Sequence, residues 1–294
     1  MITTKEAMRL FADDVAAAPF LIAPERAEEL SARLGKWGLS ELLIVDGKAR
    51  FVAMPGEDPH IRVSSAGLAG LWALSYVAYR FMDVGSRAAA SPEGQRADQL
   101  VVWADPVFRS LVAFARRLYD ADEAWPEDLP RPFAGAGIDT IDGKANTLVL
   151  AATSWVLLHE IAHMISGHSS KVSEALRLTQ EEEADRFAVD WPLAQCPSAE
   201  QREFRVMAII VALAWLFLYE QTSRGGGDHP AAIVRFWQAA SRFGVPDDSP
   251  ALENGFYALK AIFDEETAGM PADMSPRRAF EWIDDRLAEL FPRG

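Results

Sequence analysis

The sequence of 294 residues contains only one cysteine, Cys196. An internal disulfide is therefore excluded. A structural zinc site built on thiolates is excluded as well, because such sites use two or more cysteines. Scarcity of cysteine pairs is typical of proteins that work in a reducing compartment. We therefore expect a cytoplasmic protein in which Cys196 packs as a small hydrophobic side chain.

The sequence also lacks a long apolar segment. Its first ten residues have neither the basic start nor the apolar run of a signal peptide. The longest apolar run is 206–219, between Arg205 and Glu220. As a helix this run would be about 21 Å long, whereas the hydrocarbon core of a bilayer is about 30 Å thick. This length predicts a buried core helix and no stable membrane insertion.

Basic residues are few relative to acidic ones, since 29 Lys and Arg against 43 Asp and Glu give a net charge of -14. A strongly acidic protein is repelled by nucleic acids and by anionic membrane surfaces, so we expect neither as a partner. Half of the residues are hydrophobic and nine are tryptophan, enough for a sizeable core. The length fits one large domain or two small ones.

Apolar residues recur at helical spacing through much of the N-terminal part and predict helices at 4–17, 24–34, 64–82 and 95–119. Two β-rich runs, 42–45 and 49–54, flank Asp46-Gly47, a pattern that predicts a hairpin. The proline-rich stretch 125–132 is typical of a linker. We therefore predict an α+β fold, mainly α with a small β part. Residues 1–130 would form a mostly helical N-terminal part, and residues 131–294 would carry the chemistry.

The stretch 154–168 contains an H-E-x-x-H pattern, formed by His159, Glu160 and His163. Apolar residues at helical spacing predict a helix here, and Gly167 is a plausible stop. Residues four apart lie on one face of a helix, so the two histidines can bind one metal ion. Glu160 reaches the same side and can act as general base on a water molecule. The pattern alone also occurs in ordinary helices, so it leaves a purely structural interpretation open.

A third metal ligand has to come from another part of the chain, because positions 166 and 169 are serine rather than the glycine and histidine of the longer H-E-x-x-H-x-x-G-x-x-H form. Thr179 and Glu182 have the spacing of a capping box, which predicts a helix start. On that helix Glu181 and Asp185 share a face. Glu181 can supply the ligand, with Glu182 as the competing candidate, and Asp185 can accept a hydrogen bond from a ligand histidine. The alternative is a solvated acidic face, but the H-E-x-x-H pattern upstream favours the ligand.

Two glycine-rich stretches flank this region. The stretch 133–143 contains Ile138 and Ile141 and is either a short strand, able to pair with an extended peptide, or a plain loop. The triple glycine at 225–227 predicts a flexible turn before His229-Pro230.

The combination of His159–His163 with Glu181-x-x-Ala184-Asp185 resembles the gluzincin metallopeptidases, in which two histidines and one glutamate bind zinc. The resemblance implies one Zn²⁺ per chain, held by His159, His163 and Glu181. It also implies a zincin-like fold in which the glutamate-bearing helix lies behind the active-site helix.

Further details resemble a narrower group, the Lit-like phage-exclusion peptidases. These are Gly167-His168 just beyond the motif, the run 183–191, and the later His229-Pro230. The resemblance covers about residues 138–236. It implies a cytoplasmic, host-directed endopeptidase that is switched on by infection. Its protein substrate would be a translation factor, and an activating peptide or partner protein would control it.

The same resemblance assigns roles to residues outside the metal site. His229 would stabilise the oxyanion, and Arg235 would add charge or hold a substrate carbonyl, so that both join Glu160 as catalytic residues. The alternative for His229 is a loop histidine before a helix that Pro230 begins. His168 is expected to support the site or the local structure and not to bind the metal.

Two classes of function follow. The first is a zinc peptidase, either host-directed or a general housekeeping enzyme. The second is a regulatory module that keeps the zinc-binding fold but acts by binding a partner. The presence of Glu160 favours the first, because a purely structural zinc site has no use for a general base.

Overall fold

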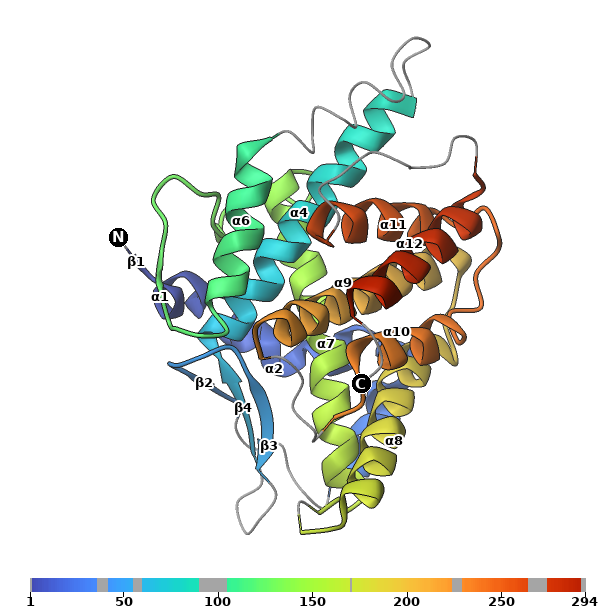
Figure 1. Ribbon diagram of the computed structural model, residues 1–294. Helices are drawn as coiled ribbons and strands as arrows, with labels where there is room; N and C mark the ends of the chain where they lie inside the picture. The colour runs from blue at the N-terminus through green and yellow to red at the C-terminus, as the bar shows by residue number, and fades with distance from the viewer. Residues whose placement is uncertain are drawn as a thin grey trace.

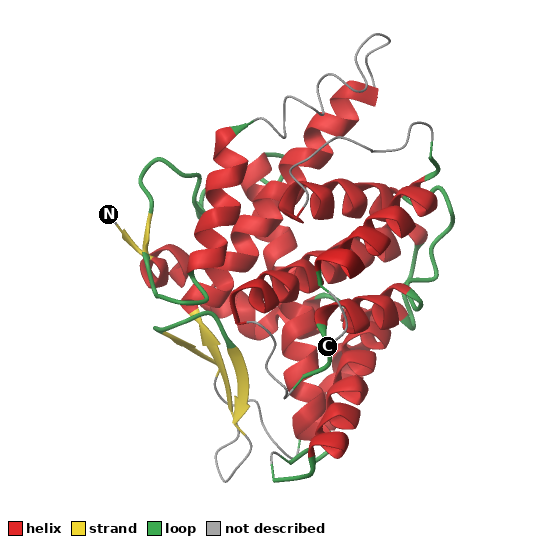
Figure 2. Cartoon of the chain, in the orientation of Figure 1, coloured by secondary structure: helices red, strands yellow, loops and turns green. Residues whose placement is uncertain are grey.

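The computed structural model describes residues 2–35, 42–54, 60–89, 105–169, 171–223, 229–263 and 274–291. Helices make up most of it and the strands lie at one edge, as predicted for a mainly α fold with a small β part (Figure 2). The strands are β1 (Ile2–Thr3), β2 (Leu42–Val45), β3 (Phe51–Met54), β4 (His60–Ser64) and β5 (Ala124–Trp125). The helices are α1 (Thr4–Met8), α2 (Ala12–Leu21), α3 (Ala27–Leu34), α4 (Ser65–Ala89), α6 (Pro106–Arg117), α7 (Ile141–Ile165), α8 (Glu174–Leu193), α9 (Ala199–Ser223), α10 (Ala232–Ala240), α11 (Pro250–Phe263) and α12 (Pro276–Leu290), with short 3-10 turns at Arg9–Phe11 and Pro24–Arg26.

Helix α7 lies at the centre of the molecule and packs against α2, α4, α8 and α9 (Figure 1). It is apolar on nearly all sides, which is the pattern of a helix surrounded by protein. Among the described residues it is the one helix whose length and composition would allow it to span a membrane, but 78% of that stretch is buried inside the protein. The predicted core helix at 206–219 forms the middle of α9, where residues 206–215 are buried.

The small sheet corrects the predicted hairpin. Its strand order is β2-β4-β3, so the two strands on either side of Asp46-Gly47 do not pair with each other. Strand β4 lies between them, parallel to β2 and antiparallel to β3. Gly47 does have a positive φ of 124°, as a turn requires, but its amide donates to Asp122 and Lys5 pairs with Asp46. These contacts direct the chain away from a tight hairpin and leave room for β4.

The N-terminal and C-terminal parts share one hydrophobic core. Trp125, at the start of the predicted linker, is buried and packs edge-to-face against Trp72 and Phe114, with ring centroids 5.5 and 5.0 Å away. Strand β5 pairs it with Ile2. Buried hydrophobic residues from both sides of position 130 belong to a single cluster. The division of the chain at 130 stays a prediction.

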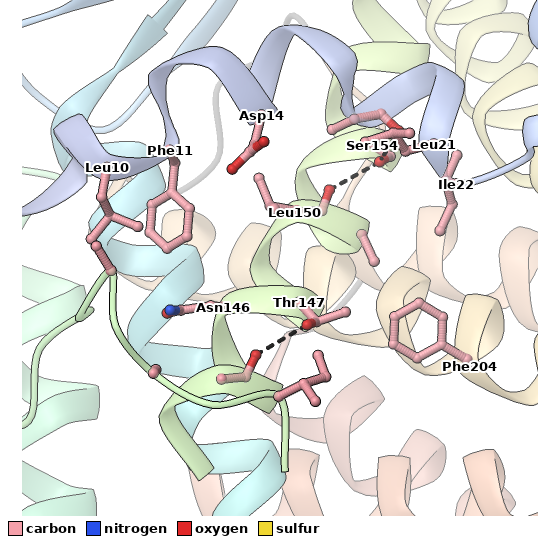
Figure 3. A pocket seen from close by; sticks show the side chains of 16 residues that line it. Leu10, Phe11, Asp14, Leu21, Ile22, Asn146, Thr147, Leu150, Ser154 and Phe204 are labelled. Atoms are coloured by element: carbon pink, nitrogen blue, oxygen red, sulfur yellow. Dashed lines mark hydrogen bonds between the residues drawn. The ribbon is translucent and has the colours of Figure 1, made fainter. Parts of the chain in front are cut away.

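The stretch 133–143 contains no strand; it is a loop that leads into α7 at Ile141. This loop closes a cavity of about 400 Å³ between α2 and the N-terminal half of α7 (Figure 3). The walls are mostly apolar, Asp14 is the one ionisable side chain that lines them, and Ile138 is exposed. Across the cavity the two helices are joined by Ser154 Oγ, which donates to the Ala18 carbonyl at 2.8 Å.

Candidate metal centre and active site

His159, His163 and Glu181 come together where α7 and α8 pack against each other. The Nε2 atoms of the two histidines are 3.1 Å apart. Glu181 Oε2 lies 3.3 Å from His159 Nε2, and its Oε1 lies 3.4 Å from His163 Nε2. Ligands of a tetrahedral zinc ion, at 2.0–2.1 Å from the metal, lie about 3.3 Å from one another. These three side chains therefore fit one metal ion of that size.

The helix that supplies the glutamate begins earlier than predicted. Ser173 caps α8, and Thr179 lies inside it, with its hydroxyl bonded to the Ala175 carbonyl. On this helix Glu181 is buried and faces the two histidines. Glu182 is exposed and contacts Gln238 instead. The geometry thus groups Glu181, and not Glu182, with the histidines.

Asp185 lies one turn after Glu181, on the same face of α8 as the spacing predicted, and contacts the other side of His159. His159 Nδ1 is 2.9 Å from Asp185 Oδ1. Arg235 on α10 donates to the same carboxylate from Nε and Nη2, at 2.7 and 2.6 Å, and all three side chains are buried. A carboxylate accepts the Nδ1 proton of His159, which leaves the Nε2 lone pair free for a metal.

These contacts shift the ionisation of the site. Burial lowers the pKa of His159, but the hydrogen bonds to Asp185 and Glu181 outweigh burial and raise that pKa to about 9. Burial raises the pKa of Asp185, but Arg235 and His159 hold it down to about 2. Hydrogen bonds from three histidines similarly hold the pKa of Glu181 well below its usual range, against the effect of burial. The metal-free site therefore carries a proton on His159 at neutral pH, which a metal ion has to displace.

His168 supports the second histidine. Gly167 ends α7 with a φ of 66°, and the chain turns back so that the His168 amide bonds to the His163 carbonyl at 2.9 Å. His168 Nδ1 then lies 2.9 Å from His163 Nδ1. Its Nε2 lies 3.2 Å from Glu183 Oε2 on α8. The contact with Glu183 was not anticipated, because a run of three glutamates gives no sign of which one bonds to a histidine.

Glu160 faces strand β3, where the Ala53 amide donates to Glu160 Oε2 at 2.6 Å. Strand β3 is an outer strand of its sheet and packs against α7. This contact was also not anticipated. Its donor is a backbone amide, so the type of residue at position 53 does not indicate it. One oxygen of the candidate general base is thus held in place, and the other remains for chemistry.

A cavity of about 330 Å³ lies beside Glu160, and the remaining candidate residues, His229 and Arg235, line it. His229 lies at its edge, 52% exposed, with Nδ1 2.7 Å from Glu181 Oε2. Arg235 also lines the cavity, although its donors are directed at Asp185. The apolar wall of the cavity is formed by Phe51, Val156, Trp155, Trp215, Leu216 and Tyr219. The cavity is thus lined by His159, Glu160, His229 and Arg235. The glycine stretch 225–227, which precedes His229, lies outside the described residues.

Two histidines of an H-E-x-x-H helix and a glutamate of the neighbouring helix α8 thus form a group that could hold a metal ion, as in the class of metal-dependent hydrolases. Comparison with known proteins narrows this class. Residues 61–255 match the peptidase U49 family, so the chain belongs to that family of peptidases. The chain is 24% identical over 259 residues to the "Cell death peptidase" of Escherichia coli strain K12, which covers 79% of this chain and 80% of that protein. No solved structure matches the chain.

Proposed function

We propose that the protein is a zinc-dependent endopeptidase of the gluzincin type. The observation that carries the proposal is the grouping of His159, His163 and Glu181 at distances that suit one zinc ion, with Glu160 on the same helix. Membership of a peptidase family supports hydrolysis of a peptide bond as the reaction.

The chain's own residues have clear parts in such a reaction. Zinc, when bound, would polarise the scissile carbonyl and lower the pKa of a water molecule. Glu160 would take the proton from the attacking water and pass it to the leaving amine. The Ala53 amide keeps Glu160 Oε2 in a fixed direction, so the carboxylate does not have to reorganise when it accepts the proton.

Strand β3 is our candidate for the substrate-binding edge. The Ser64 amide donates to the Arg50 carbonyl, so these two residues form a hydrogen-bonded pair at the end of the β3–β4 ladder. Hydrogen-bonded pairs alternate with non-hydrogen-bonded pairs along antiparallel strands, so the amides of Phe51 and Ala53 point away from β4. Both then face the cleft side, where Ala53 reaches Glu160. An extended peptide can add to such an edge through main-chain hydrogen bonds. Strand β3 would thus pair with an extended peptide, the role that the stretch 133–143 would have had as a strand.

The metal ligands can be tested by elemental analysis. Wild-type protein should contain one zinc ion per chain, and Glu181→Ala should lose most of it, because three protein ligands are the minimum for a catalytic zinc site. We expect its zinc affinity to fall by more than the roughly 10–100-fold that loss of a hydrogen-bond partner of a ligand causes. Glu182→Ala is the matched control and should keep its zinc. Undiminished zinc in Glu181→Ala would contradict this ligand set.

His229 is proposed to stabilise the negative charge that develops on the carbonyl oxygen during attack. Its ring lies at the cleft, next to Glu181, within reach of a reacting group there. Loss of one such donor costs about 10²–10³ in rate, so His229→Ala should lower turnover by that factor. The side chain is half exposed, so thermal stability and zinc content should remain close to wild type. A His229→Ala enzyme with unchanged turnover would leave His229 as a loop residue before α10.

We further propose a host-directed role in the cytoplasm, with a translation factor as substrate and an activating peptide or partner protein. The name of the E. coli relative, a cell death peptidase, supports an action on the host's own proteins. The cavity between α2 and α7 offers a place for an activator, because α2 of the N-terminal part and the loop 133–140 both line it. The purified protein should therefore cleave a general substrate such as casein slowly or not at all. Vigorous casein cleavage would point to a housekeeping peptidase.

A further inference from the structure

We infer that Glu183 is a positioning residue for the metal site, acting through His168 to fix the ring direction and the tautomer of the ligand His163. The inference rests on the metal site of the proposed function. Glu183 touches neither the metal ligands nor the substrate cleft, and its side chain is 47% exposed.

The contacts of the two ring nitrogens of His163 determine which atom donates and which accepts in each hydrogen bond. His163 Nε2 faces His159 Nε2 and Glu181 Oε1, at 3.1 and 3.4 Å, so this nitrogen is the one that a metal would meet. A metal ligand presents a lone pair, so the proton of the neutral ring is on Nδ1. His163 Nδ1 therefore donates to His168 Nδ1, 2.9 Å away.

The next bond follows from the first. Because His168 Nδ1 accepts, the proton of this neutral imidazole is on Nε2. That nitrogen lies 3.2 Å from Glu183 Oε2, a carboxylate oxygen that can only accept. The three residues thus form one directed chain, from His163 through His168 to Glu183, in which the carboxylate at the end selects the tautomer of both rings.

The local structure holds His168, the middle residue of this series of hydrogen bonds, in place. The His168 side chain is only 6% exposed, and its ring packs edge-to-face on that of His163, with centroids 4.9 Å apart. Gly167 makes this possible, because its φ of 66° is a left-handed conformation that favours glycine and folds His168 back under the end of α7.

The two ligand histidines are therefore supported in different ways. His159 is held by Asp185, itself bonded to Arg235 in the buried interior. The support of His163 ends at a carboxylate that water reaches. Hydrogen-bond partners of ligand histidines typically contribute 10–100-fold to metal affinity. Solvent weakens the contribution of an exposed charge, so we expect less from Glu183.

The consecutive glutamates provide a matched experiment. Zinc dissociation constants of intact protein would be measured by competition with a chelator. Glu183→Ala should weaken zinc binding about 3- to 10-fold, and Glu182→Ala, which removes a neighbouring exposed carboxylate, should leave it unchanged. Glu183→Gln keeps an acceptor oxygen and should restore most of the affinity. Equal affinities for Glu183→Ala and Glu182→Ala would overturn the inference while leaving the zinc site intact.

Nitrogen-15 NMR of the histidine rings gives a second readout, which a general loss of stability would not change. In the zinc-loaded wild type, His168 should carry its proton on Nε2, and in Glu183→Ala this preference should weaken. A wild-type His168 protonated on Nδ1 would reverse the chain and overturn the inference. Failure of the wild type to bind zinc at all would instead refute the proposed function, and with it this extension.

Discussion

Replacing Glu160 by glutamine should abolish measurable hydrolysis of the substrate, a loss of about 10²–10⁴-fold, while zinc content and thermal stability stay near those of the wild type. The amide oxygen of glutamine can still accept the bond from the Ala53 amide, so the side chain keeps its direction. It cannot accept a proton from water near neutral pH. The change thus removes the general base and little else.

The result separates the two classes of function. Cells that express the wild type and cells that express Glu160→Gln would be compared for growth and for protein fragments during phage infection, which is expected to activate the enzyme, with Glu182→Gln as a control that also removes one carboxylate. A peptidase loses both toxicity and fragments in Glu160→Gln and keeps them in the control. Full toxicity of Glu160→Gln without fragments would identify a module that acts by binding a partner.

The parts of the site that lie within one helix could be predicted from sequence. His159, Glu160 and His163 follow from helical spacing, and the fold adds only the packing around them, which buries His159. The shared face of Glu181 and Asp185 likewise follows from a spacing of four residues. Which histidine Asp185 meets, and that Arg235 joins it, depends on how α8 and α10 pack against α7, which spacing does not contain.

Contacts between residues that are distant in the sequence could not be predicted, for the same reason. The Ala53 amide that holds Glu160 is a backbone group, so no side chain marks it in the sequence. The predicted hairpin was wrong because Asp46-Gly47 indicates only a local turn. The strands on either side of it are separated by β4, and the five residues of β4 gave no strong strand signal. The helix start predicted at Thr179 was wrong, because Ser173 caps α8 and Thr179 lies inside it.

Replacing Arg235 by alanine should lower the free energy of unfolding by about 3 kcal/mol, the low end of the range for a broken buried pair, because the buried Asp185 carboxylate loses one cationic partner and keeps only His159. Denaturant unfolding of the metal-free protein at pH 7 would measure this. The pKa of Asp185 is held at about 2, below its ordinary 3.8, so its stabilising effect is complete above pH 3.8 and is lost as the pH falls through about 2. Arg242→Ala is the control, because its pair with Asp190 is exposed and should contribute about 0–1 kcal/mol.

A double replacement distinguishes support of the metal site from stability alone. Arg235→Met with Asp185→Leu removes both buried charges, and apolar side chains of similar size often restore the stability that breaking such a pair costs. His159 Nδ1 would still lack its acceptor, so neither its tautomer nor its ring direction would be fixed. We therefore expect near wild-type stability together with about 10–100-fold weaker zinc binding. Wild-type zinc affinity in the double variant would make the pair purely structural. A stable Arg235→Ala protein with normal zinc affinity and low turnover would instead return Arg235 to direct contact with the substrate.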